Sequence, residues 1–185
     1  KRLSNHFKGL YWRQLFVTAG MVILTLFLLG ASFFSLSYNY ARGQRNEELA
    51  GQARVVAQLS VSYLENGRYL DIEELQHEED FQQLATFAAT VSDVDFMICD
   101  TEGHVLLSTD ASLSGLVVTM PEEMTAEVLE KGTSSDRTDL SGLYENRRFV
   151  VGVPAVSVDS QEAVGVVYAV SSTTSLDAMW KGFVG

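Results

Sequence analysis

The stretch Leu15–Leu36, LFVTAGMVILTLFLLGASFFSL, decides the architecture of this chain because it contains no charged residue. A bilayer core of about 30 Å requires roughly 20 apolar residues in a helix. A helix also satisfies its own backbone hydrogen bonds inside lipid. A secretory signal peptide is the main alternative, but its apolar region is usually only about 7–15 residues long. The sequence therefore predicts a transmembrane helix over residues 15–37 that is kept as an anchor.

The charge of the chain differs on the two sides of this stretch. Residues 1–42 contain five basic residues and no acidic residue, whereas residues 43–185 contain eight basic and all 24 acidic residues. Lys and Arg beside a span are retained on the cytoplasmic side. We therefore expect a basic cytoplasmic lead over residues 1–14, with the rest of the chain after the span outside. The acidic exterior argues against nucleic acid as a partner, since phosphate binding needs a basic face.

The remainder has the size of one domain, about 140 residues, and we place it at residues 38–174. The chain begins with Lys and stops at Gly185 within an apolar segment, so we interpret it as part of a longer protein. Cys99 is the only cysteine, which excludes an intrachain disulfide and a cysteine metal site. Its apolar neighbours predict a buried strand thiol.

A long helix is predicted over residues 38–66, which contain no Pro. Its apolar and small residues recur at heptad spacing: Leu49, Ala53, Val56, Ser60 and Tyr63. This stripe has two interpretations, a helix packed on its own domain or the seam of a parallel homodimer. Gly67 is placed to end the helix as a C-cap glycine.

Residues 69–94 are helical in composition. Their predicted core positions are Leu75, Leu84, Phe87 and Ala88. The segment is rich in acids, and a cation site formed by Glu74, Glu78, Glu79 and Asp80 is conceivable because hard cations prefer carboxylates. A solvated helix face is the commoner meaning of such a cluster, so we expect no metal and no cofactor.

The second half of the domain is predicted to consist mainly of strands. We expect a hairpin over 95–110, a helix over 121–131 opened by Pro121 and stopped by Gly132, a polar loop over 133–141, and strands over 147–158 and 163–171. The last two strands are rich in valine at both parities, which indicates a sheet covered on both faces. Pro154 cannot donate a ladder hydrogen bond, so it indicates a sheet edge or a bulge.

Catalytic motifs are absent from the sequence: there is no nucleophile elbow, phosphate-binding loop or zinc spacing. Asp100 and Asp110 flank the predicted hairpin and are most simply explained by solvation at strand ends. His104 follows the turn glycine and is interpreted as a polar strand-end residue. No active site is therefore predicted, and whether the whole protein is an enzyme stays open.

The order of these elements resembles the extracytoplasmic sensor region of bacterial sensor histidine kinases, of the PAS-like or single-Cache type. The resemblance rests on the D-x-x-G turn at Asp100–Gly103, on VGVP at Val151–Pro154 and on VGVVY at Val164–Tyr168. It covers nearly the whole chain. It implies an α+β fold: a transmembrane helix continuing into a long helix on one face of a central antiparallel sheet, with a ligand pocket on the other face. In the family, the phosphorylated histidine and the ATP-binding motifs follow a second span, and none is present here.

Three classes of function remain open. The favoured one is the input region of a two-component sensor histidine kinase. The same module can drive a chemoreceptor or a cyclic-dinucleotide enzyme, or act as a membrane-anchored ligand-binding module. A pilin-like structural subunit is disfavoured, because pilins of that kind have an acid near the start of the apolar run and no basic lead.

A ligand site is expected where aromatic and basic residues coincide in the second half. Tyr168 lies on the last strand, and Tyr144, Arg147 and Arg148 come just before its neighbour. Together they offer an aromatic wall and guanidinium groups to a small anionic or polar ligand. The alternative is that the two arginines are simply solvated at a strand start.

The signal of such a sensor would leave through the long helix and through residues 175–185. Thr174 and Asp177 have capping-box spacing, so a helix should begin at Ser175 and lead into a second transmembrane helix, with Trp180 and Lys181 as interfacial anchors.

Overall fold

The computed structural model describes residues 3–67 and 71–171, so the predicted exit helix over 175–185 lies outside the described residues. The chain divides into two compact units, Lys1–Gln44 and Arg45–Gly185. Helix α1 (Leu3–Gly67) contributes to both. In the first unit, Trp12–Ser37 is long and apolar enough to cross a membrane, with a mean hydropathy of 2.2. This agrees with the apolar stretch that the sequence singled out.

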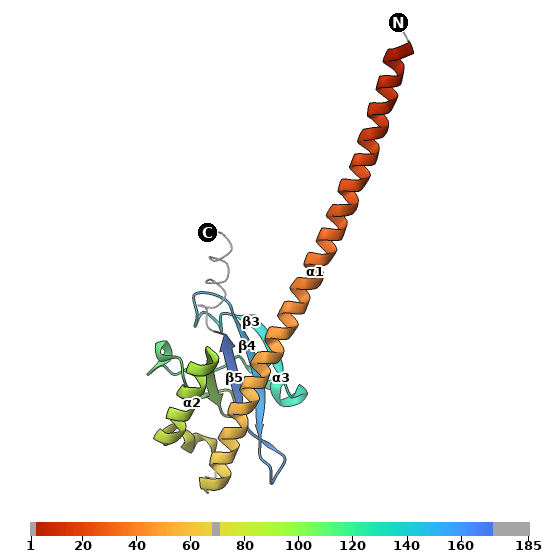
Figure 1. The fold of residues 1–185 in the computed structure, drawn as a ribbon. Helices are drawn as coiled ribbons and strands as arrows, with labels where there is room; N and C mark the ends of the chain where they lie inside the picture. The colour runs from red at the N-terminus through yellow and green to blue at the C-terminus, as the bar shows by residue number, and fades with distance from the viewer. Residues whose placement is uncertain (1–2, 68–70, 172–185) are drawn as a thin grey trace. The chain divides into compact units, whose positions relative to one another are not determined.

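The second unit is an α+β domain around a five-stranded antiparallel sheet, as the sequence predicted (Figure 1). Its strands, in the spatial order β2-β1-β5-β4-β3, are β2 (Val105–Ser108), β1 (Val94–Cys99), β5 (Ala163–Ser171), β4 (Arg148–Val156) and β3 (Ser134–Thr138). The predicted hairpin is confirmed as β1 and β2, and both valine-rich strands are confirmed as β4 and β5.

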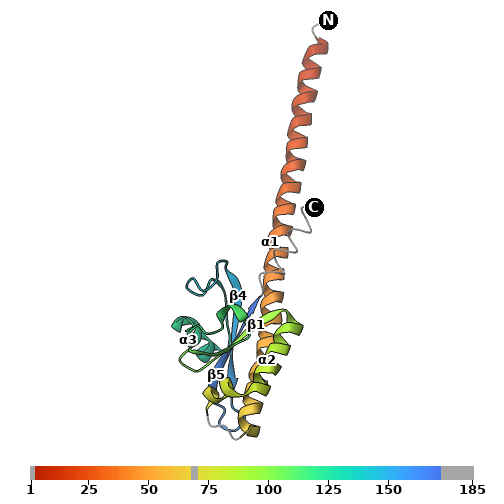
Figure 2. The same ribbon diagram turned by 90° about the vertical axis from the view of Figure 1, so that its left-hand side faces the viewer.

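One face of the sheet packs against α1 and α2 (Glu79–Ser92); we call it the α1 face (Figure 2). The part of α1 that begins at Arg45 buries Leu49, Ala53, Val56 and Ser60, each at most 2% exposed. The heptad stripe therefore packs on its own domain, and its members are not available as the seam of a dimer.

The opposite face packs against α3 (Glu122–Lys131), and we call it the α3 face (Figure 2). Met97, Val150, Val166 and Tyr168 point into this layer, since side chains alternate along a strand. The two buried clusters confirm the prediction of a sheet covered on both sides. A short 3-10 helix, η2 (Ala111–Leu113), precedes α3.

Two sequence expectations are wrong in detail. Residues 69–94 do not form one helix: a 3-10 helix, η1 (Ile72–His77), is followed by α2 after a break at Glu78. The break resets the helical phase, so Phe81 is buried and Phe87 is 66% exposed. The predicted polar loop over 133–141 contains β3, an edge strand whose sequence, SSDRT, has no apolar alternation.

Pro154 lies at a sheet edge, as predicted. Strand β3 pairs with β4 only as far as Gly152, so β4 has no neighbour on that side at Pro154. On its other side, β4 continues to pair with β5, where Pro154 faces Val166.

Candidate functional site

One end of the sheet gathers three charged side chains on the α3 face. Asp95 lies on β1 beside Val170 of β5, which is paired with Val150 of β4. Arg148, two residues before Val150, therefore projects from the same face. Its Nη1 atom is 3.7 Å from Asp95 Oδ2 and 3.7 Å from Asp110 Oδ2. The two acids reach one guanidinium because β1 starts where β2 ends.

Tyr144 completes this cluster from the loop between β3 and β4. The guanidinium carbon of Arg148 lies 3.8 Å from the centre of the Tyr144 ring, within cation–π distance. The Tyr144 hydroxyl donates to Asp110 Oδ2 at 3.2 Å. The loop turns sharply before it, with left-handed backbone at Leu140, Ser141 and Gly142. We call Asp95, Asp110, Tyr144 and Arg148 the Arg148 cluster.

The Arg148 cluster has two carboxylates for one guanidinium, and the two differ in their titration. Burial, followed by the charge of Asp110, raises the pKa of Asp95 above its ordinary 3.8. Burial also acts to raise the pKa of Asp110, but hydrogen bonds from Ser112 and Tyr144 outweigh it and the pKa is lowered. The surroundings therefore stabilise the charged form of Asp110, whereas they destabilise the charged form of Asp95.

Two further features of the cluster bear on binding. The Arg148 Nε atom is buried and has no hydrogen-bond partner within residues 3–67 and 71–171. The side chains remain partly accessible, with 16% of Arg148 and 25% of Asp95 exposed. The buried Nε atom is out of reach of a ligand, but a partly open group with two carboxylates for one guanidinium can accept hydrogen bonds from a small polar molecule.

The four residues proposed from the sequence do not form one group. Tyr144 and Arg148 are in contact, and Arg147 is exposed. Tyr168 is fully buried in the middle of β5, where its hydroxyl lies 2.9 Å from Thr125 Oγ1 on α3. Burial raises the pKa of Tyr168 to about 12. The two tyrosines fill the α3 face, and the ligand-binding role of the four residues stays a prediction.

Sequence reasoning missed Asp95 and Asp110. Asp110 was attributed to solvation at a strand end, but only 12% of its side chain is exposed and it accepts from Tyr144. The sequence did contain a usable signal: a charged residue lies in the first two positions of each of two otherwise apolar strands, Asp95 in β1 and Arg148 in β4.

Other candidates gain no support from the structure. In the described part of the chain, no group of three or more His, Cys, Asp or Glu side chains is placed to hold a metal ion. His104 is exposed at the turn, as expected, and its Nδ1 lies 2.8 Å from Asp100 Oδ2. Cys99 is fully buried as predicted, and burial raises the pKa of its thiol, which makes it unreactive.

Comparisons with known proteins bear on the fold. No family model matches the chain, and no curated protein sequence matches it significantly. Among solved structures, it is similar to the sensor domain of the Vibrio cholerae histidine kinase DctB, with a TM-score of 0.50 and 14% identity over 72% of this chain. The match spans 51% of the DctB chain, about half its length.

Two chemoreceptor ligand-binding domains also match, with lower scores. That of Campylobacter jejuni Tlp3, in complex with L-valine, gives a TM-score of 0.36 and 10% identity over 75% of this chain and 62% of that one. That of Pseudomonas fluorescens CtaA, in complex with L-serine, gives 0.31 and 18% identity over 73% and 62%. The domain from Arg45 onward thus has a fold similar to that of part of the DctB sensor domain.

Proposed function

We propose that this chain is the extracytoplasmic input region of a two-component sensor histidine kinase. The observation that carries the proposal is the construction of α1, which contains the candidate span at Trp12–Ser37 and also supplies the helix packed on a sensor-type sheet. A ligand shifts such a system only by binding one of its arrangements better than another. Helix α1 is an element through which that preference can reach the membrane.

The ligand proposed for the Arg148 cluster is a small polar molecule that carries a hydrogen-bond donor or an amino group. The sequence suggested a small anionic or polar ligand, but Asp95 and Asp110 already flank Arg148 at 3.7 Å. An added anion would have to displace one of them, whereas a cationic group would offset their excess negative charge.

The kinase assignment is tested with the full-length protein in membrane vesicles. Incubation with labelled ATP should give an acid-labile phosphoryl group on the protein itself, which a His-to-Gln variant at the phosphorylated position abolishes. Absence of self-phosphorylation, combined with stimulation of a separately added kinase, would instead establish the alternative, a chemoreceptor. Synthesis of a cyclic dinucleotide from GTP would establish the other alternative.

The topology proposal places residues 1–14 in the cytoplasm and the domain outside, on the basis of the charge difference across the apolar stretch. Single cysteines at Asn5 and Ser135, in a Cys99→Ser background, are labelled with an impermeant thiol reagent in intact cells. Labelling is expected at position 135 and not at position 5, and the reverse result would refute the orientation.

Dimerisation is proposed through the side of α1 that faces away from the sheet. Val55 on that side is 56% exposed, whereas the heptad stripe is buried. Cysteine at Val55, again without Cys99, should form a crosslinked dimer in membranes. A cysteine at Glu130, exposed on α3, is the matched control and should stay monomeric.

A further inference from the structure

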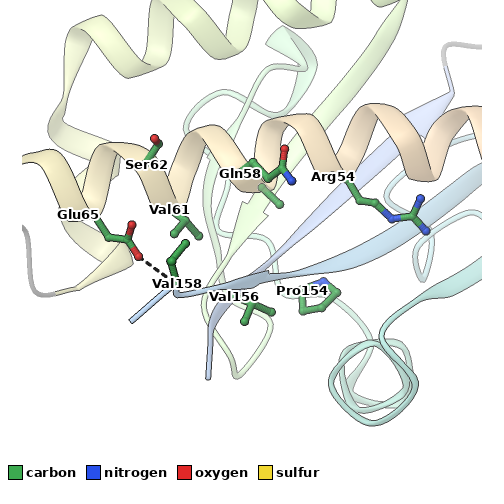
Figure 3. Close-up of a pocket in the computed structure, with 9 residues that line it drawn as sticks. Arg54, Gln58, Val61, Ser62, Glu65, Pro154, Val156 and Val158 are labelled. Atoms are coloured by element: carbon green, nitrogen blue, oxygen red, sulfur yellow. Dashed lines mark hydrogen bonds between the residues drawn. The ribbon is translucent and has the colours of Figure 1, made fainter. Parts of the chain in front are cut away.

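A groove separate from the Arg148 cluster lies between α1 and the free edge of β4 (Figure 3). Its volume is about 430 Å³. One wall is the side of α1 from Arg54 to Glu65, and the other is formed by Pro154 and Val156 of β4 and by Val158, which follows the strand. Both walls belong to the unit that begins at Arg45. The groove therefore joins the helix to the sheet within one compact body.

The groove is open because β3 stops short of it. Pairing between β3 and β4 ends at Gly152, so the following residues of β4 have no strand beside them on that side. Pro154 has no backbone N–H, and the N–H of Val158 donates to Glu65 Oε1 at 2.9 Å. Two of the backbone donors on this edge are thus absent or occupied, which disfavours an added strand. The groove suits a small molecule better than an extended peptide.

The lining is apolar in its middle. Val61 and Ala57 on α1 are buried beneath it, at 5% and 4% exposed. Val156 and Val158 on the opposite wall are 39% and 67% exposed. A hydrocarbon group lying along them would remove apolar surface from water, at about 25 cal/mol per Å².

Arg54 supplies the only basic side chain of the groove. Figure 3 shows it at the Pro154 end, with Glu65 at the other end. Within the described residues, no carboxylate lies in ion-pair distance of Arg54, whereas Lys131 has one and Arg148 has two. Glu65 is eleven residues further along the helix, about 16 Å at 1.5 Å per residue. That separation exceeds the screening length of about 8 Å at physiological salt, so Glu65 leaves the potential at Arg54 positive.

We propose that this groove binds a small carboxylate with a short hydrocarbon chain. The carboxylate pairs with the Arg54 guanidinium and the chain lies against Val61, Pro154 and Val156. The bound molecule contacts α1 and β4 together, so it stabilises the packing of the helix on the sheet edge. This site does not depend on the Arg148 cluster or on the kinase assignment.

The test uses hexanoate and the full chain in nanodiscs of zwitterionic lipid, with empty nanodiscs as the blank. Ligand-observed NMR measures the concentration of hexanoate at half-saturation. The Arg54→Gln variant should raise that concentration about tenfold or more. Arg137→Gln is the matched control, since it removes an exposed arginine outside the groove, and it should leave the value unchanged. Val156→Asp places a negative charge in the groove, of the same sign as the charge of hexanoate, and should also weaken binding.

Two related compounds separate the contributions of head group and chain. Hexanol retains the chain without the charge, and acetate retains the charge without the chain, so each should bind much more weakly than hexanoate. The proposal is overturned if hexanoate shows no saturable binding to the wild-type chain. It is equally overturned if Arg54→Gln binds hexanoate as well as wild type, or if hexanol binds as tightly as hexanoate.

Discussion

The two faces of the sheet are packed by different kinds of side chain. The α1 face is packed by apolar side chains from α1, η1, α2 and three strands, and its buried Ser60 bonds only within its own helix. The α3 face also has an apolar centre, but Tyr168 and Tyr144 bring hydroxyls into it, and it ends in the Arg148 cluster. Apolar packing is non-directional and supplies most of the folding free energy. Hydrogen-bonded and charged groups add little net stability but fix geometry. We therefore expect the α1 face to set stability and the α3 face to set specificity.

The sharpest test of this difference is Leu49→Ala on α1. Leu49 is 0% exposed within the α1 face, and removing its side chain leaves a cavity. The free energy of unfolding should fall by about 2–5 kcal/mol. Urea denaturation of the domain, followed by far-ultraviolet circular dichroism, measures the loss. Val55→Ala, on the exposed side of the same helix, should change it by no more than about 0.5 kcal/mol. Equal effects of the two substitutions would contradict the packing of α1 described here.

A second test adds one methyl group to each face. At Gly165 on β5, a Cβ atom would lie 2.6 Å from the carbonyl oxygen of Cys99 and would also meet Ile72. At Gly152 on β4, it would lie 2.6 Å from Cε1 of Tyr168 and 2.7 Å from Cγ2 of Val128. Overpacking costs about 1–3 kcal/mol, and Gly165→Ala should approach about 3 kcal/mol because backbone cannot move aside.

Gly152→Ala should cost less than Gly165→Ala, because side chains of the α3 face can adjust. Thermal unfolding of the two variants, compared under one set of conditions, gives the ranking. A larger loss for Gly152→Ala would show that the α3 face is the more rigid of the two.

The sequence predicted the α1 face better than the α3 face, for a physical reason. The heptad spacing of Leu49 and Val56 is local and survives in the helix. The valine-rich runs of β4 and β5 are equally local. By contrast, Asp110 and Arg148 are 38 positions apart, and their contact depends on the order of strands in the sheet, which no local pattern encodes.

Two other errors have the same origin. Strand β3 has no apolar alternation, so only its pairing with β4 identifies it as a strand. The exposure of Phe87 follows from the break at Glu78, which a continuous helical pattern could not reveal. The groove beside Arg54 likewise results from the length of β3 and has no sequence signature of its own.

Removing the charge of either acid in the Arg148 cluster should change the stability of the domain, but by different amounts for the two acids. Asp110→Asn removes a carboxylate that accepts from Ser112 and Tyr144, so the free energy of unfolding near neutral pH should fall by about 1–3 kcal/mol. Asp95→Asn removes a carboxylate whose pKa is raised, mainly by burial, so its charge opposes folding at neutral pH. This variant should be neutral or slightly more stable. Chemical denaturation of both variants is the measurement, and a greater loss for Asp95→Asn would contradict the assignment.

The pH dependence of stability tests independently whether the charge of Asp95 opposes folding. A raised pKa in the folded state means that stability increases as pH falls through the folded value. Wild type should therefore gain a contribution on mild acidification that Asp95→Asn lacks.

The smallest expected effect concerns the exposed turn that joins β1 to β2. His104 Nδ1 lies 2.8 Å from Asp100 Oδ2, and Asp100 also accepts from the backbone N–H of Glu102 and of His104. The hydrogen bond to Asp100, and then its charge, raise the pKa of His104 above 6.5. For Asp100, partial burial acts to raise the pKa, but the hydrogen bonds from His104 and Glu102 outweigh it, and the pKa falls below 3.8.

The sign of the effect follows from these two shifts. The stabilisation from His104 is complete below pH 6.5 and is lost as pH rises through its raised pKa, whereas that from Asp100 is present above pH 3.8 and is lost as pH falls through its lowered pKa. The pair should therefore stabilise the domain most between these two values. A double-mutant cycle with His104→Gln and Asp100→Asn, measured by thermal unfolding at about pH 5 and about pH 9, should show coupling only at the lower pH. Coupling of equal size at both values would mean that the hydrogen bond between the two side chains does not depend on the imidazolium. No coupling at either value would mean that the backbone N–H bonds to Asp100 hold the turn alone.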